Sequence, residues 1–519
     1  MKHVYGNDDN LADTPEDPQN EAITGFREAV HSRDIDAYGA AALKLRRWMM
    51  SHDPYYPFYH FTGPESWIND PNGPIYYKGK YHLFYQFDPV IRDEGGWRKS
   101  SRCWGHAVSR DLVHWTDWPV AIWPDTPQDY GGVYSGNTVV DDTGTPCALY
   151  TGNTTGRSGL RYGILAKSRD DMLTWDKRVV MDHAQRPNPD TPVHHDGYIW
   201  QETGVWYQLV GGTTGGNDPH GAAFLWTSTD LVHWTLVHNI APDIRLGEFW
   251  ELPYLIELGG RYILFAGHGN PYWIGTFNRE SLIFTPDDPE PSQIDTGTYY
   301  SYNLNMTDTG GPGAAHRQLM HGWVTGPPSP SAEVPYWQGA HSIPRALAHR
   351  DCRIVQEPIS EIKGLRGNHL RLTGKNGVAA GLSKVMGDCL EIVACFFRPI
   401  DRRVFGFKVF VSPNGQEYVR VYYDGQTGSL GVDGPTLDRN VAELTGFKVP
   451  KQQADLSGET DVHMRVFIDR SIIEVFVNGY ALTARAFPSP DARGIELIAG
   501  DDASFLKVMD LYQMRSLWQ

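Results

Sequence analysis

The amino-acid sequence predicts an all-β protein: a five-bladed β-propeller followed by a C-terminal β-sandwich, with a short N-terminal helical extension. In residues 55–350, and again in 366–519, short strand-like runs are broken by Gly, Pro, Asn and Asp, and helical periodicity is rare. The segment SRDLVHW at 109–115 returns as STDLVHW at 228–234, with a weaker copy, SRDDMLTW, at 168–175. A repeat of about 60 residues with several strands per unit is typical of propeller blades, and residues 55–350 hold about five such units.

The repeated segments are predicted to be architectural. In each copy the Asp is expected to cap a turn and the Trp to pack between blades, as with Asp111 and Trp115 in the first copy. No catalytic role is assigned to them.

Residues 1–54 form an N-terminal extension, of which 21–50 have a helical pattern. Apolar residues recur at helical spacing in two successive stretches, first at Ile23, Phe26 and Val30, then at Ile35, Tyr38, Leu45 and Met49. This pattern predicts a short helical hairpin that packs against the main domain or against a neighbouring subunit.

The C-terminal part begins with a linker at 351–365 and continues as a sandwich domain at 366–519. Residues 465–469 and 472–477 are predicted to form a β-hairpin, and Asn478-Gly479 is predicted to turn the next one. The regular succession of short strands is typical of a β-sandwich. A structural role is favoured for it over lectin-like binding.

Charge and composition limit the partners of this chain. Its 519 residues have a formal net charge of −16. Nucleic acids and anionic membranes are disfavoured, because both attract clustered Lys and Arg. No apolar run approaches the ~20 residues of a membrane span. A neutral polyol ligand fits this composition better.

The five cysteines have neither the spacing of metal ligands nor an even count that would indicate a disulfide framework. This pattern favours a reducing compartment. Residues 1–18 are acidic and polar and lack the hydrophobic core of a signal peptide. We therefore expect a protein that is cytoplasmic, or one that is secreted with the signal peptide already removed.

The segment WINDPNG at 67–73 places Asp70 between two asparagines and before Pro71 and Gly73. Pro71 biases Asp70 towards an extended conformation, and Gly73 permits a tight turn. An Asp at such a turn can project into a cavity. An isolated Asn-Asp-Pro is also compatible with a surface Asx-turn, so other motifs are needed to decide between the two readings.

Six further motifs accompany this segment along the chain. They are WGHAVS at 104–109, YSG at 134–136, WE at 250–251, IPR at 343–345, QEP at 356–358 and FIDRS at 467–471. Together with WINDPNG they resemble glycoside hydrolase family 32, which contains invertases, inulinases, levanases and fructan transferases. The resemblance extends from about residue 55 to the C-terminus, and it also implies a five-bladed propeller with a sandwich.

The resemblance implies a catalytic role for three carboxylates. Asp70 matches the nucleophile and Glu251 matches the general acid/base of a retaining glycosidase. Asp196 matches the carboxylate that binds sugar hydroxyls and stabilises the oxocarbenium-like transition state. Because a nucleophile must be ionised and an acid protonated, the two groups need different environments.

The sequence departs from the family pattern at three positions around these carboxylates. Leu252 stands where a Cys usually follows the acid/base, His195 where an Arg is expected and Gly197 where a Pro is expected. Arg stays charged and donates a fixed fork of hydrogen bonds, whereas the charge of His changes near neutral pH. Either another side chain compensates for this change, or the substrate or acceptor specificity is altered.

Four more residues are implied as sugar-subsite residues, with His195 as a fifth. Gln86 and Ser135 would hydrogen-bond sugar hydroxyls, Trp104 would offer a stacking face, and Asn69 lies next to the nucleophile. No cluster has metal-ligand spacing and no Gly-rich phosphate loop follows a strand. We expect neither a metal nor another cofactor.

The sequence therefore predicts a retaining enzyme that cleaves β-fructofuranosidic bonds of sucrose or fructans through a fructosyl-enzyme. The alternative is a fructosyltransferase of the same family, including one that forms difructose anhydride from levan or inulin. A non-catalytic sugar-binding protein and an arabinofuranosidase are less favoured. The expected partner is a small-molecule or oligosaccharide fructoside, not nucleic acid or membrane, and the N-terminal helices or the sandwich are candidate surfaces for a homo-oligomer.

Overall fold

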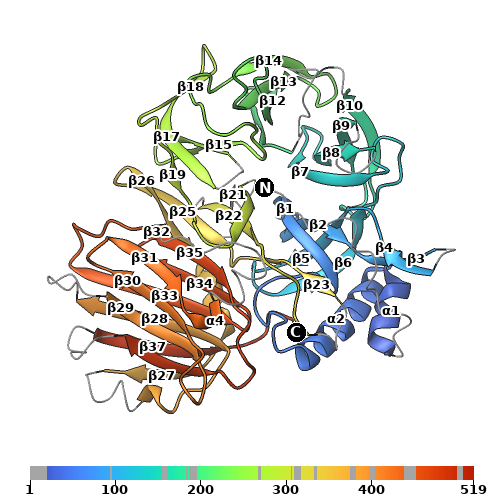
Figure 1. The fold of residues 1–519 in the computed structure, drawn as a ribbon. Helices are drawn as coiled ribbons and strands as arrows, with labels where there is room; N and C mark the ends of the chain where they lie inside the picture. The colour runs from blue at the N-terminus through green and yellow to red at the C-terminus, as the bar shows by residue number, and fades with distance from the viewer. Residues whose placement is uncertain are drawn as a thin grey trace.

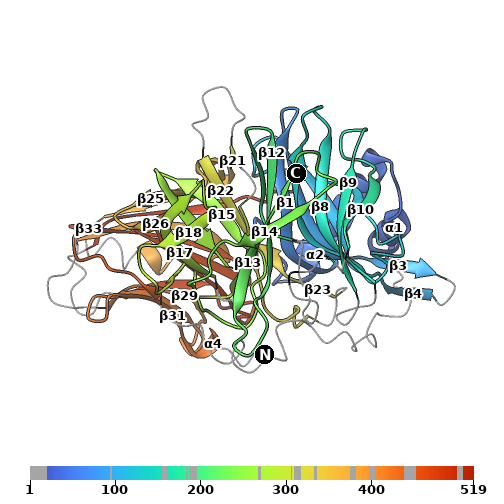
Figure 2. The ribbon, with the colours of Figure 1, turned by 90° about the horizontal axis from the view of Figure 1, so that it is seen from above.

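The molecule consists of a ring of β-sheets with a two-sheet domain packed against one side of it (Figure 1). This computed structural model describes residues 20–93, 96–154, 160–182, 185, 187, 196–266, 270–304, 307–308, 317–331, 336–373, 381–397, 404–437, 452–498 and 506–518. Seen from above, the two parts lie side by side, with the helices at the outer edge of the ring (Figure 2). The predicted all-β class, with a propeller followed by a sandwich, is confirmed.

Two helices precede the ring, as the apolar spacing predicted. α1 (Glu21–Ala29) is capped by the side chain of Asn20, and α2 (Ile35–His52) is capped by that of Asp34. Side-chain oxygens at these positions accept hydrogen bonds from the first free backbone N–H groups of a helix. Among the described residues, neither helix nor any other combines the length and apolarity needed to cross a membrane.

The helical hairpin is fixed to the propeller by two buried ion pairs. Arg27 of α1 makes a bidentate contact with Glu65. Arg46 of α2 binds the Asp117 carboxylate with both Nε and Nη2, at 2.7 and 2.8 Å, and its guanidinium stacks 3.5 Å from the Trp518 ring. Planar guanidinium groups suit such buried bidentate contacts. The predicted packing of the hairpin against the main domain is confirmed.

Apart from one two-stranded ribbon, five sheets lie between residues 66 and 358 of the described chain. The count of five propeller blades stays a prediction. The first contains β1 (Ser66–Tyr77), β2 (Lys80–Asp88), β5 (Cys103–Ser109), β6 (Trp115–Ile122) and β23 (Trp337–Gln338). The second contains β7 (Gly132–Val140), β8 (Pro146–Asn153), β9 (Arg161–Lys167) and β10 (Asp176–Met181). The third contains β11 (Ile199–Glu202), β12 (Val205–Thr213), β13 (Gly221–Ser228) and β14 (Thr235–Asn239).

The remaining sheets of the ring are more irregular. The fourth contains β15 (Tyr254–Leu258), β16 (Arg261–Phe265), β17 (Pro271–Asn278), β18 (Ile283–Pro286) and β19 (Ser292–Gln293). The fifth contains β20 (Tyr299–Asn303), β21 (Thr307–Asp308), β22 (Arg317–Val324), β24 (Ala340–His341), β25 (Arg345–Arg350) and β26 (Arg353–Pro358). β3 (Val90–Asp93) and β4 (Gly96–Lys99) form a separate two-stranded ribbon.

The ring is closed by a strand from its C-terminal end. β23 follows β22 in the chain, yet it pairs in parallel with β1 of the first sheet. The innermost strand β1 also contacts both β7 and β20. The strands at the axis therefore come from sheets far apart in sequence, which positions their side chains around one central region.

The repeated segments occupy the same position in three sheets, between the third and fourth strands in order from the axis. Asp111 Oδ1 accepts hydrogen bonds from the backbone N–H groups of Val113 and His114, at 3.0 and 2.8 Å. Asp230 makes the equivalent contacts in the third sheet. The predicted turn-capping role of the Asp is confirmed, and it explains why the sequence repeats at the blade period.

The C-terminal domain contains two facing sheets with a continuous apolar core between them. One sheet contains β27 (Arg366–Leu372), β37 (Leu506–Met514), β28 (Cys389–Phe397), β33 (Asp461–Asp469), β34 (Ile472–Val477) and β35 (Tyr480–Arg485). The other contains β32 (Gln452–Gln453), β31 (Ser429–Asp433), β30 (Val419–Asp424), β29 (Val404–Val411) and β36 (Gly494–Ile498). Two short helical elements complete it, η4 (Ser360–Leu365) before the sandwich and α4 (Pro435–Leu437).

Two details of this domain bear on the sequence predictions. β33 and β34 form the predicted hairpin, and Asn478 and Gly479 turn the next one with positive φ angles of 45° and 86°. β26 pairs with β25, so the first half of the segment predicted as a linker, 351–365, lies in the fifth sheet. η4 forms the actual connection.

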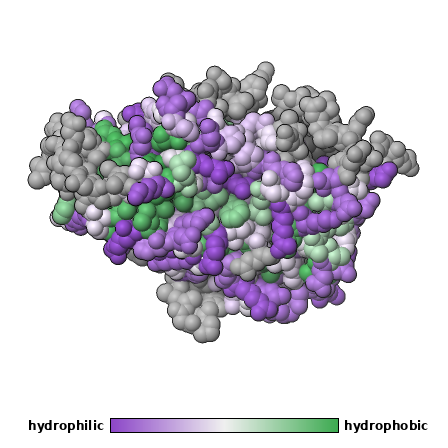
Figure 3. All heavy atoms as spheres, turned by 90° about the horizontal axis from the view of Figure 1, so that it is seen from below, coloured by the Kyte–Doolittle hydropathy of each residue, from purple (hydrophilic) through white to green (hydrophobic). Residues whose placement is uncertain are grey.

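Some large apolar side chains are exposed on the outside of the sandwich. Among the described residues they include Leu370, Met386, Phe397 and Val404. On the face seen from below, hydrophobic residues gather mainly in the left half, while hydrophilic residues cover most of the right half (Figure 3).

A buried charged network joins the propeller to the sandwich. His60 contacts Asp469 through Nδ1 at 2.9 Å and Glu474 through Nε2 at 3.0 Å. Arg345 contacts Glu474 at 2.7 Å and Asp295 at 3.1 Å. Burial alone would lower the pKa of His60, but the hydrogen bonds to the two carboxylates raise it to about 9. The IPR and FIDRS motifs therefore hold the domains together.

Candidate active site

Asp70 lies in β1, where the pairing of this innermost strand with β2 is interrupted. The register shifts by one residue between Ile68 and Pro71, and again between Asn72 and Ile75. Asp70 is half-buried and belongs to the first of these two β-bulges. The sequence predicted a turn at this segment; the structure keeps it in a strand, because a bulge re-aims a side chain without ending the strand.

Gly73, at the end of the same motif, allows β1 and β7 to approach closely. Its φ is 45°, and a Cβ at this position would lie 2.2 Å from the backbone nitrogen of Thr138. The Thr138 hydroxyl also donates a hydrogen bond to the Gly73 carbonyl. This contact brings the second sheet, and with it Ser135, next to Asp70.

A chain of hydrogen bonds fixes the Asp70 carboxylate. Ser135 Oγ on β7 donates to Asp70 Oδ2 at 2.5 Å, and Gln86 Nε2 on β2 donates to Ser135 Oγ at 2.7 Å. Ser135 and Gln86 are both almost fully buried. Since a donated hydrogen bond stabilises the charged form of a carboxylate, this arrangement suits an ionised nucleophile.

Trp104 packs in the interior of the propeller and is not exposed at the site. Its side chain is fully buried, and Nε1 donates to the Tyr134 carbonyl at 2.9 Å. The ring packs against Phe84 and Tyr150. The prediction that Trp104 offers a stacking face to a sugar is therefore wrong, because the interior of the first two sheets covers the ring on all sides.

Asp196 is buried and is held through its own backbone. Asn137 Nδ2 on β7 donates to the Asp196 carbonyl at 3.2 Å and to the Gly197 carbonyl at 2.6 Å. Asn303 Nδ2 on β20 in turn donates to Asn137 Oδ1 at 3.0 Å. Three sheets thus contribute to the placement of one carboxylate. His195 lies outside the described residues.

Gly197 is explained by the contacts of its backbone. A Cβ at this position would lie 1.9 Å from the Leu209 carbonyl oxygen and 3.2 Å from Cδ of Pro253. Both Pro and Ala carry this atom, so the site has room only for glycine. The departure from the expected Pro follows from this close approach.

Tyr254 is a buried phenol whose pKa responds to two of the carboxylates. Its hydroxyl is fully buried at the start of β15. Burial raises the pKa of Tyr254 well above its ordinary value, and the negative charges of Asp196 and Asp70 raise it further. Ser135 and Asn137 lie two residues apart on β7 and contact the Asp70 side chain and the Asp196 backbone, so Asp70 and Asp196 lie next to the same stretch of this strand.

Glu251 lies in the segment that leads into β15. It is half-buried between the fully buried Trp250 and Leu252, and the latter adopts a positive φ of 47°. Trp250 donates from its backbone to Gly212 at 3.0 Å. The Tyr198 N–H donates to the Pro253 carbonyl at 3.0 Å, which ties this segment to the strand that follows Asp196. Asp70, Asp196 and Glu251 thus lie before or near the start of innermost strands in three different sheets.

Comparison with known protein families identifies the family of this chain. The N-terminal domain profile of the glycosyl hydrolases family 32 matches residues 60–358, and the C-terminal domain profile of the same family matches residues 361–512. The chain belongs to glycosyl hydrolases family 32. Both family 32 domains are therefore present, and α1 and α2 precede the matched region.

Characterised relatives span nearly the whole chain. A levanase from Bacillus subtilis is 30% identical over 518 residues, covering 90% of this chain and 71% of the relative. A sucrose-6-phosphate hydrolase from Escherichia coli is 27% identical over 487 residues, covering 89% and 95%. A cell-wall β-fructofuranosidase from Zea mays is 28% identical over 512 residues, covering 83% and 84%.

Solved structures agree in fold. Fructan 1-exohydrolase IIa from Cichorium intybus superposes with a TM-score of 0.73 at 24% identity, covering 89% of this chain and 98% of that one. Sucrose-6-phosphate hydrolase from Lactobacillus gasseri gives a TM-score of 0.75 at 23% identity, covering 95% and 99%. At this level of identity the likeness establishes the fold.

His341 is a further residue of this family 32 site that the sequence analysis missed. Its Nε2 donates at 2.7 Å to the backbone carbonyl of Asn69, directly before Asp70. Burial lowers the pKa of His341 to about 4, although the hydrogen bond to Asn69 partly opposes this effect. The ring is therefore neutral at ordinary pH and can act as a fixed donor. The sequence carries no local sign of this contact, which joins β24 to β1.

Proposed function

We propose that this chain is a retaining glycosidase that cleaves β-fructofuranosidic bonds of sucrose or fructans. The observation that carries the proposal is the Asp70 carboxylate, which accepts a hydrogen bond from Ser135 on β7, two residues before the Asn137 that holds the Asp196 backbone. A pair of carboxyl groups with distinct tasks is what retaining glycoside cleavage needs. Membership of family 32 supports the same chemistry.

In the first step Asp70 attacks the anomeric carbon of the fructosyl unit, and its oxygen forms the new bond as the glycosidic C–O bond breaks. Glu251 gives its proton to the departing oxygen, so the leaving group departs as a neutral alcohol. A fructosyl-enzyme ester and a deprotonated Glu251 remain. Glu251 then takes a proton from water, which attacks the ester and restores both carboxyl groups.

Asp196 is assigned to binding and transition-state stabilisation. Its buried carboxylate can accept hydrogen bonds from sugar hydroxyls, and its negative charge would stabilise the oxocarbenium-like transition state. Asn137 acts as a positioning residue, because its side chain donates hydrogen bonds to the backbone carbonyls of Asp196 and Gly197. Asn69, Gln86 and Ser135 remain assigned to the sugar subsite, with Gln86 and Ser135 also fixing the nucleophile.

The substrate class follows from the relatives. A levanase, a sucrose-6-phosphate hydrolase and a β-fructofuranosidase each match more than four fifths of the chain. Levan, sucrose 6-phosphate and β-fructofuranosides all contain a fructofuranosyl group. The net charge of −16 favours a neutral sugar over a phosphorylated one, because the overall field of the protein repels anions. Sucrose, levan and inulin are therefore the first substrates to test.

The decisive experiment follows the products of the full-length protein on sucrose, levan and inulin. Free fructose is expected, and Asp70→Asn should lower turnover by at least about a thousandfold without loss of folding. Asp230→Asn is the matched control, because Asp230 caps the turn between the third and fourth strands of the third sheet, away from the innermost strand. In Glu251→Gln, an activated aryl fructoside should permit trapping of the fructosyl ester on Asp70 by mass spectrometry.

Several outcomes would refute the proposal or parts of it. The absence of both fructose and fructosylated products would exclude fructoside chemistry, and release of arabinose from arabinan would support an arabinofuranosidase. Difructose anhydride or longer fructans, with little free fructose, would assign transfer in place of hydrolysis. Activity retained in Asp70→Asn would remove Asp70 from the role of nucleophile.

A further inference from the structure

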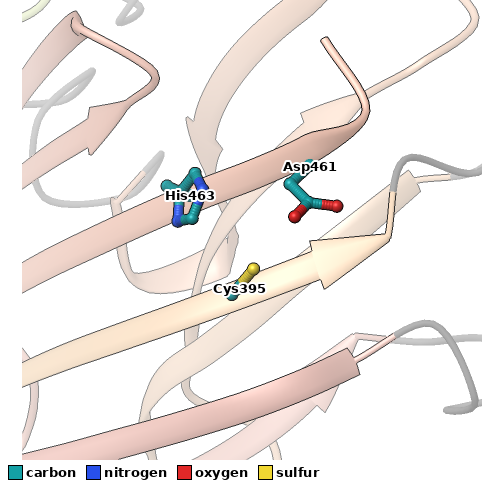
Figure 4. Close-up of side chains that lie close together, drawn as sticks. All are labelled: Cys395, Asp461 and His463. Atoms are coloured by element: carbon teal, nitrogen blue, oxygen red, sulfur yellow. The ribbon is translucent and has the colours of Figure 1, made fainter.

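A second cluster of reactive side chains lies on the sandwich. Cys395 comes from β28, whereas Asp461 and His463 come from the neighbouring strand β33. Cys395 is paired directly with His463, and Asp461 follows on the same face two residues away. The three side chains turn towards the space between the two strands (Figure 4). Their possible ligand atoms all lie within 4.8 Å of one another.

We propose that Cys395, Asp461 and His463 bind a zinc ion. Thiolate, imidazole and carboxylate are the protein ligands that zinc takes, and a three-ligand site leaves the fourth tetrahedral position to water. Zinc–ligand bonds of about 2.0–2.3 Å place neighbouring ligand atoms roughly 3–4 Å apart. Small rotations of the three side chains from their observed positions would therefore bring them to bonding distance.

The backbone around the cluster is already fixed. The side chain of Asn478, at the β34–β35 turn, accepts a hydrogen bond from the His463 N–H at 2.7 Å and donates to the Asp461 carbonyl at 3.0 Å. Ligands on paired strands with a fixed backbone lose little freedom on binding. His463 is exposed, and Cys395 and Asp461 are half-buried, so an ion and its water can reach the cluster from solvent.

Lys507 on β37 competes with zinc for one ligand. Its ammonium group forms an ion pair with Asp461 and lies 4.0 Å above the Phe397 ring. Zinc must displace this contact, and the positive charge nearby repels a divalent cation. The geometry therefore points to moderate affinity, in the micromolar range and not the much tighter range of four-ligand structural sites. Removal of the Lys507 charge should strengthen binding.

The test is metal titration of the full-length protein after treatment with a chelator. One zinc per chain is expected by competition with a chromophoric chelator, and cadmium should produce a thiolate charge-transfer band. Cys395→Ser and His463→Ala should each weaken zinc binding by more than about tenfold, since even outer partners of a ligand are worth that much. Lys507→Met should tighten it.

Cys352→Ser is the matched control, because Cys352 is an exposed free thiol in the propeller turn between β25 and β26. This variant should bind zinc as the wild type does. The proposal is overturned if no saturable binding occurs, if Cys395→Ser and His463→Ala bind unchanged, or if Cys352→Ser abolishes the cadmium band. Since circular dichroism and melting show whether each variant is folded, a lost ligand is distinguishable from a lost fold.

Discussion

Replacement of Gly197 by Ala tests how tightly the structure holds Asp196. The added Cβ would lie 1.9 Å from the Leu209 carbonyl oxygen, well inside van der Waals contact. The neighbouring atom belongs to the backbone of β12, so no side-chain rotation relieves the overlap. The chain at Gly197 must move, and Asp196 must move with it.

The size of the effect can be estimated in two parts. Insertion of a methyl group into a packed site typically costs about 1–3 kcal/mol of folding free energy. Displacement of a catalytic group by about 1 Å can lower the rate about a hundredfold. We therefore expect kcat/KM on sucrose or a fructan to fall by about a hundredfold, with a melting temperature lower by a few degrees.

The assay compares kcat/KM and thermal melting of Gly197→Ala with those of Gly25→Ala. Gly25 lies in α1, and a Cβ there would meet nothing within 4 Å. This control should keep full activity and gain about 0.5–1 kcal/mol, because Ala favours a helix over Gly. Gly197→Pro introduces the residue expected from the family pattern, and it should be as damaging as Ala.

Wild-type kcat/KM in Gly197→Ala, together with an unchanged melting temperature, would refute this reasoning. It would mean that the loop before β11 absorbs the methyl group without moving Asp196. A lower melting temperature with unchanged kcat/KM would show that Gly197 matters for packing but not for the position of Asp196.

Three further predictions concern other parts of the molecule. Glu251→Gln should slow cleavage of sucrose far more than cleavage of an activated aryl fructoside, because only the poorer leaving group needs a proton; equal losses in kcat would contradict an acid role. His341→Leu should lower kcat about tenfold through the unsatisfied Asn69 carbonyl, with His341→Gln restoring much of it, and equal kcat in both variants would exclude positioning by hydrogen bonding. His60 has a folded pKa of about 9, above its unfolded value of 6.5, so its contribution to stability is full below about pH 6.5 and lost as pH rises through 9. His60→Gln should lower the free energy of unfolding by about 3–5 kcal/mol, because the buried Asp469 and Glu474 carboxylates lose their positively charged partner. In this variant the melting temperature should also change less between pH 6.5 and 9.

The sequence determined the features that depend on local spacing. The Ser-x-Asp repeat predicted the blade turns because Asp111 and Asp230 bond to backbone groups only two or three residues away. Helical spacing predicted α1 and α2 for the same reason. The motifs around Asp70 and Glu251 indicated the family, since the residues that form them are contiguous.

Only the tertiary structure decided which distant groups meet. The sequence does not show that Trp104 is covered, that Gly197 lies against a carbonyl of β12, or that His341 reaches the backbone next to Asp70. Cys395 and His463 have no metal-like spacing, yet the pairing of β28 with β33 places them opposite each other. Such contacts arise when sheets close into a ring or pair across a sandwich. Local patterns report the conformation of each strand, whereas its neighbours depend on how the whole chain packs.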